Sequence, residues 1–158
     1  MKTIGREILW SVAVAMLIAG CQHMSPPNVE LQRVRLGGIG LSGSTLIAEL
    51  QIENPNDFAI ETDSITFALE ARSSSNPETW SPVTNGISRE PIIIAAGQNE
   101  DVQIPIELTY ASLGQPVRSI LERGTFTYRV SGEVSISQPR RSTAPFSRTG
   151  NLSMTGSQ

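Results

Sequence analysis

The sequence predicts an all-β protein, an antiparallel β-sandwich of about seven strands with one short helix. From Val29 onward, apolar and polar residues alternate with a period of two, which is typical of strands that have one buried and one solvated face. Turn residues separate these runs at intervals of roughly 8–12 residues, as in sandwich folds. Only one stretch has helical periodicity instead.

The first twenty residues have the pattern of an export signal. Lys2 and Arg6 form a positive n-region, and a nearly continuous apolar run follows from Ile8 to Ala19. A membrane-spanning helix needs about 20 apolar residues, so this run is too short to span a bilayer. We therefore predict a signal peptide over residues 1–20.

The only cysteine stands directly after this segment. Ala19 and Gly20 are small, and the pattern of small residues followed by Cys21 resembles the lipobox of bacterial lipoproteins. The resemblance implies cleavage between Gly20 and Cys21 and acylation of Cys21, with palmitate-type chains as the membrane anchor. Gln22, rather than Asp, then implies an outer-membrane protein facing the periplasm. The alternative is an ordinary secreted protein with a cysteine near its cleavage site.

Composition limits what the rest of the chain can be. Residues 21–28 are expected to form a lipidated tether and residues 29–155 a single domain, which is large enough to fold without metal or disulfide. Beyond residue 20 there are ten Arg, no Lys and fourteen Asp plus Glu, a net charge of −4. This acidity argues against nucleic-acid binding. We expect a monomer.

Four runs show the strand alternation most clearly. In each, every second side chain is apolar and is predicted to face the core. These residues are Leu46, Ala48, Leu50 and Ile52; Ile65, Phe67 and Leu69; Val102, Ile104, Ile106 and Leu108; and Phe126, Tyr128, Val130, Val134 and Ile136.

Two irregularities refine this prediction. The apolar phase slips by one residue between Leu31 and Val34, and a β-bulge there would restore the register. Pro105 has no N–H for the sheet ladder, so its strand is expected at an edge, or with that position facing outward.

One segment follows helical spacing. Apolar residues between Leu113 and Leu121 recur at i, i+4, i+7 and i+8. Proline is tolerated in the first turn of a helix, and Gly124 stands where a left-handed C-cap would end it. These signals predict a short helix from about Pro116 to Arg123.

No residue pattern predicts catalysis, a cofactor or a metal. The Gly38–Gly43 stretch matches G-x-G-x-x-G, but a strand pattern follows it, whereas a dinucleotide site needs a helix there. The predicted fold has no His, Lys or Cys to activate a serine, and its carboxylates lie on outward strand positions without metal-ligand spacing. Arg140 and Arg141 are expected at a solvated hairpin tip, with lipid phosphate as the alternative contact.

Asn54-Pro55-Asn56 is the most informative motif of the domain. Pro55 restricts Asn54 to extended geometry, and an Asn side chain can close a turn on the backbone. The motif therefore predicts the end of the strand that precedes it.

In context, these residues resemble the type-2 late embryogenesis abundant family, also called the water stress and hypersensitive response (WHy) domain. The ordered pieces are Gln51–Asn56, Ile65–Ala71, Val102–Leu108, Val117–Gly124 and Thr125–Val134. The resemblance implies an immunoglobulin- or fibronectin-III-like sandwich without catalytic residues. The longer segment from Ser73 to Pro82, with Trp80, departs from the family pattern.

Two functions follow as hypotheses. The resemblance implies a non-enzymatic lipoprotein that protects the envelope during drying, cold or heat. The alternative is a structural adaptor that binds an envelope protein through an edge strand or an exposed Trp80.

Overall fold

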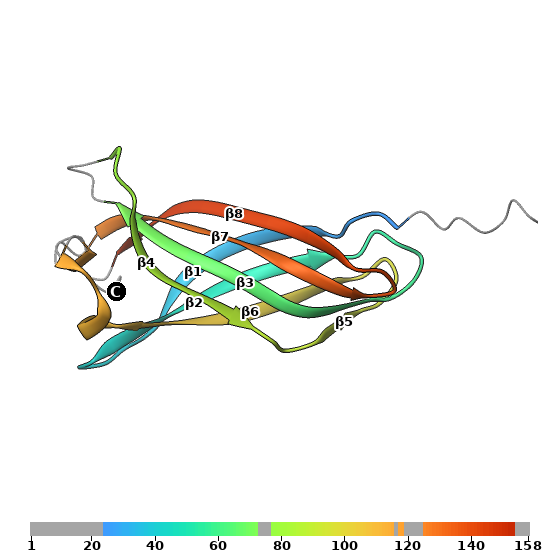
Figure 1. Ribbon diagram of the computed structural model, residues 1–158, viewed down its shortest axis with the longest axis horizontal. Coiled ribbons are helices and arrows are strands. Elements are labelled where there is room, and N and C mark those ends of the chain that lie inside the picture. Colours follow the sequence, from blue (N-terminus) through green and yellow to red (C-terminus); the bar gives the residue numbers. More distant parts are fainter. Residues whose placement is uncertain (1–23, 73–76, 116, 119–124, 154–158) are drawn as a thin grey trace, which may run out of the picture.

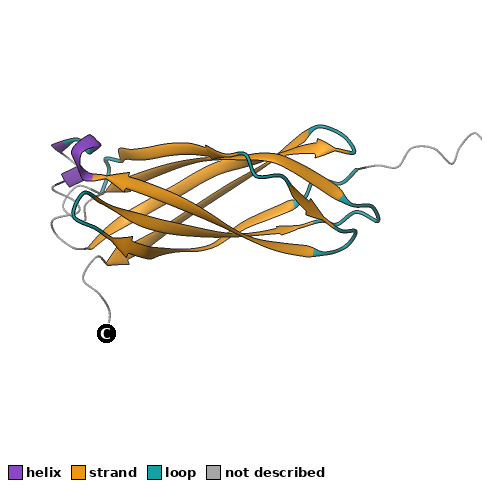
Figure 2. Cartoon of the chain, turned by 90° about the horizontal axis from the view of Figure 1, so that it is seen from below, coloured by secondary structure: helices purple, strands orange, loops and turns teal. Residues whose placement is uncertain are grey.

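The computed structural model describes residues 24–72, 77–115, 117–118 and 125–153. Two antiparallel sheets pack face to face and form an elongated sandwich (Figure 1, Figure 2). The strands are β1 (Asn28–Ile39), β2 (Gly43–Glu53), β3 (Ile60–Arg72), β4 (Ser81–Ser88), β5 (Ile92–Ile94), β6 (Asn99–Thr109), β7 (Thr125–Gln138) and β8 (Ser142–Ser153). A 3-10 turn, η2 (Tyr110–Ser112), follows β6.

The strands are divided between a small and a large sheet. The small sheet has the order β1-β2-β6, and the large one has the order β4-β3-β7-β8, with β5 pairing to the start of β3. All pairings are antiparallel, so the all-β sandwich prediction is confirmed.

The predicted core lies between the sheets. The alternating residues of β2 and β7, and those of β6 from Ile104 to Leu108, are buried as expected, and Leu46, Leu50 and Val130 are at most 1% exposed. Val102 of β6 and Phe67 of β3 are the exceptions, because both are only partly buried. The Phe67 ring lies over Gly86 of the edge strand β4, where no side chain covers it.

The two irregularities were predicted correctly. The pairing of β1 with β2 shifts between Leu31 and Arg33, which is the expected bulge. Pro105 lies on β6, an edge strand, and is exposed. At the bulge, Arg148 of β8 donates from Nη1 to the main-chain oxygen of Leu31 at 2.8 Å, a bond that joins the two sheets at one seam.

Two predictions need comment. The structure describes eight strands instead of about seven, because β5 was not foreseen: its three consecutive isoleucines show no alternation. The helix predicted from about Pro116 to Arg123 lies mostly outside the described residues. Within them, Leu113 and Val117 are buried, and the N–H of Arg118 donates to the carbonyl of Gly114 at 3.1 Å.

Candidate functional site

The chain enters the sandwich at one of its two ends, which we call the tether end. It comprises residues 24–27 and the loops 54–59, 95–98 and 139–141, which Figure 1 shows together beside the start of β1. The predicted cleavage and lipidation residues, Gly20 and Cys21, lie outside the described residues.

Asn54 is the buried centre of the tether end. Its side chain is 0% exposed, and its Nδ2 lies 2.8 Å from the carbonyl oxygen of Phe58 and 3.1 Å from those of Ile94 and Ala95. Its main-chain N–H donates to Gln98 at 3.0 Å. One amide therefore joins the β2–β3 loop to the β5–β6 loop.

Asn56 extends this network to the tether. Its main-chain N–H and its Nδ2 both donate to Oδ1 of Asn54, at 3.1 and 2.9 Å, and the first of these bonds is the predicted Asx-turn. The Asn56 amide also exchanges two hydrogen bonds with the main chain of Ser25, at 2.8 and 3.0 Å. We call Asn54 and Asn56 the asparagine pair.

The hydrogen bonds of the asparagine pair explain why both positions are asparagine. Buried carbonyls need donors, and a carboxylate at either position could only accept hydrogen bonds. An amide group supplies both a donor and an acceptor. The two side chains therefore satisfy the loop carbonyls and the main-chain N–H of Ser25 together. The sequence predicted the turn but missed the pairing with Ser25, because the partners are 31 residues apart.

Pairing with Ser25 joins the end of the predicted tether to the domain. Of the predicted tether, residues 21–28, the structure describes the part from Met24 onward: Met24 packs against the core, Pro27 is buried, and β1 begins at Asn28. Beside them is a hollow of about 340 Å³ lined by Met24, Phe58, Ala59, Pro139 and Arg140. Arg140 and Arg141 lie in the β7–β8 loop and are exposed, as predicted.

Trp80 lies on the outer face of the large sheet. Two guanidinium groups lie over its ring, that of Arg72 at 4.5 Å and that of Arg129 at 4.4 Å from the ring centroid. Arg129 also pairs with Glu70 at 2.6 Å. The indole is therefore partly buried by its own chain and does not form the exposed apolar anchor that the adaptor hypothesis requires at this position.

The glycine-rich stretch forms the β1–β2 hairpin, as its strand pattern predicted. The N–H of Gly40 donates to the carbonyl of Gly43 at 2.8 Å, and β2 starts at Gly43. Ile39 and Leu41 at this tip are 60% and 106% exposed. The hairpin lies at the end opposite the tether end (Figure 1).

Glu49, on an outward position of β2, forms two ion pairs. Glu49 is held at 2.6 Å by both Arg33 and Arg35 across the β1–β2 ladder, and these hydrogen bonds lower the pKa of Glu49. Across the described residues, no three His, Cys, Asp or Glu side chains gather in a way that could hold a metal ion.

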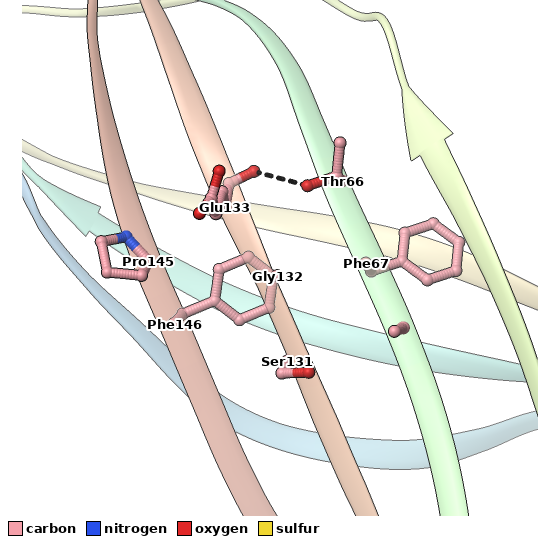
Figure 3. Close-up of a pocket in the computed structure, with 8 residues that line it drawn as sticks. Thr66, Phe67, Ser131, Gly132, Glu133, Pro145 and Phe146 are labelled. Carbon is pink, nitrogen blue, oxygen red and sulfur yellow. Dashed lines mark hydrogen bonds between the residues drawn. The ribbon is translucent and has the colours of Figure 1, made fainter. Parts of the chain in front are cut away.

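A shallow depression of about 480 Å³ lies on the large sheet. Thr66, Ala68, Ser131 and Pro145 contribute small side chains, and the Thr66 hydroxyl donates to the main-chain oxygen of Glu133 at 3.4 Å (Figure 3). Glu133 is the only ionisable residue in the lining that the structure describes, so the depression holds no acid–base pair.

The described part of the chain contains no helix of the length and apolarity needed to cross a membrane.

Comparison with known proteins identifies a family. The sequence profile of the late embryogenesis abundant protein family matches residues 49–150, from β2 to β8 and through the asparagine pair. No curated protein matches the chain.

Solved structures share the fold. A protein from Archaeoglobus fulgidus is 14% identical, with a TM-score of 0.58 over 80% of this chain and 94% of that one. A protein from Arabidopsis thaliana is 16% identical, with a TM-score of 0.65 over 85% and 88%. A putative late embryogenesis abundant protein is 17% identical, with a TM-score of 0.57 over 93% and 82%.

Proposed function

This chain belongs to the late embryogenesis abundant protein family, and we propose that it is a non-enzymatic, stress-protective lipoprotein. Acylated Cys21 holds it on the outer membrane, facing the periplasm, where it shields envelope proteins or the membrane during drying, cold or heat. The family match over residues 49–150 is the observation that carries the protective role. The export-signal pattern that ends in Ala19-Gly20-Cys21 supports the anchor.

The architecture suits a protein that must keep its shape as water is withdrawn. The asparagine pair satisfies its loop carbonyls within the chain, and such internal bonds strengthen as the local dielectric constant falls. Polar and charged side chains occupy most exposed positions of β6, so they can offer hydrogen bonds to a client surface in place of water.

Fractionation tests the anchor. The Cys21→Ser variant should remain uncleaved or become soluble, since two or three acyl chains are needed for stable attachment. Gln22→Asp is the matched control, which keeps the cysteine and should remain attached to a membrane. Recovery of Cys21→Ser with the outer membrane at wild-type levels would show that the lipoprotein assignment is wrong.

A second experiment tests protection. The mature domain without its lipid is added to a labile enzyme before heating or drying, and the surviving activity is compared with that for an inert protein at equal mass. We expect higher survival with the domain. Equal survival, together with a single stoichiometric envelope partner that cross-links to wild type but not to Trp80→Ala, would favour the adaptor instead.

A further inference from the structure

We propose that the tether end is a membrane-contact surface that rests on the leaflet holding the lipid anchor. This inference rests on the lipidation of Cys21 proposed above and adds the orientation of the domain. In this orientation, the loops 54–59, 95–98 and 139–141 contact lipid headgroups, and the long axis of the sandwich points away from the bilayer.

The length of free chain is the first argument. Asn56 holds Ser25 to the domain through two hydrogen bonds, and Met24 packs against the core. Only three residue steps separate Cys21 from Met24, a span of roughly 11 Å when fully extended. This span is comparable with the depth of the headgroup region, so an acylated Cys21 would bring the tether end to the lipid surface.

The chemistry of the surface is the second argument. The hollow at this end combines Met24, Phe58 and Pro139 with the cation of Arg140. Side chains with an apolar body and a polar or cationic tip suit the membrane interface. The adjacent β5–β6 loop adds exposed Ala95, Ala96 and Gly97. These residues are uncharged, so they can enter the membrane interface without desolvating a charge.

The charge of the loops differs from that of the chain. The whole chain has a net charge of −3, yet Asp57 is the only acidic residue in the tether-end loops, against Arg140 and Arg141. Glu53, Glu61 and Glu100 belong to the strands that adjoin these loops. The tether-end loops thus carry two positive charges and one negative charge, so Arg140 and Arg141 can meet lipid phosphates while the acyl chains supply the attachment.

Tryptophan quenching tests the orientation. The lipidated protein is reconstituted into phosphatidylethanolamine–phosphatidylglycerol vesicles with brominated acyl chains, in a Trp80→Phe background. Ala59→Trp places the probe at an exposed position of the hollow, so the fold should tolerate it. Leu41→Trp is the matched control at the opposite end of the sandwich.

We expect the Ala59→Trp protein to lose roughly half of its emission, as for a residue 5–10 Å into the interface, and the Leu41→Trp protein to lose almost none. Adding Arg140→Glu and Arg141→Glu should reduce the quenching at least about twofold, and so should replacing phosphatidylglycerol with phosphatidylcholine.

The outcomes separate the two proposals. Vesicle-bound protein whose Ala59→Trp probe is quenched no more than the Leu41→Trp probe would overturn the orientation but leave the lipid anchor intact. Protein that is not acylated and stays in the supernatant would overturn both. Strong quenching that survives the charge reversal and the lipid change would overturn the role of Arg140 and Arg141 while retaining the contact surface.

Discussion

Asn54 is a small polar residue whose substitution we expect to lower the free energy of unfolding strongly. Asn54→Ala removes the amide donor of the Phe58 and Ile94 carbonyls, whereas the Ala95 carbonyl still accepts from the N–H of Gln98 at 3.1 Å. Each buried group left without a partner costs about 1–3 kcal/mol. We expect a loss of about 3 kcal/mol in the free energy of unfolding. Asn85→Ala, at an exposed position of β4, is the control and should change it by less than about 0.5 kcal/mol. Urea denaturation measures both, and equal midpoints would contradict this account.

Glu49 has a stabilising role that depends on pH. Hydrogen bonds from Arg33 and Arg35 lower its pKa in the folded state, so its stabilisation is present above the ordinary carboxyl pKa of about 4.3. It is lost as the pH falls through the lowered value. Glu49→Gln should therefore destabilise the protein slightly at pH 7 and less at pH 3. Exposed Glu133→Gln provides the control, and a pH-independent difference for Glu49→Gln would exclude the ion-pair explanation.

At the scale of elements, the β1–β2 hairpin packs tightly at one glycine and loosely at another. A Cβ on Gly43 would overlap the main-chain oxygen of Leu108 on β6, whereas one on Gly38 would meet nothing within 4 Å. We expect Gly43→Ala to destabilise the domain by about 1–3 kcal/mol and Gly38→Ala to have little effect. Thermal unfolding of the two variants checks this difference, and equal melting temperatures would show that the strands move apart at little cost.

Strand periodicity was sufficient to predict the elements but not the connections that hold them. Alternation identified β2, β6 and β7, and the phase slip located the bulge in β1, because these signals are local in sequence. The pairing of Asn54 with Ile94 joins residues 40 positions apart, and that of Arg148 with Leu31 joins residues 117 apart. Such contacts depend on the packing of the sheets, which no local pattern specifies. The Arg72 and Arg129 guanidinium groups on Trp80 were missed for the same reason.

At the scale of the whole molecule, one core lies between both sheets, so the domain should unfold as a single unit. Leu50 is 1% exposed near the middle of β2, and Leu50→Ala removes buried apolar volume at a cost of about 2–5 kcal/mol. Leu41→Ala makes the same chemical change at a fully exposed position and should be nearly neutral. The loss at Leu50 should shift two signals equally: the fluorescence of Trp80 on the large sheet and the far-ultraviolet signal of all the strands. If the two transitions separate in Leu50→Ala, the sheets unfold independently, and the bond from Arg148 of β8 to Leu31 of β1 does not couple them.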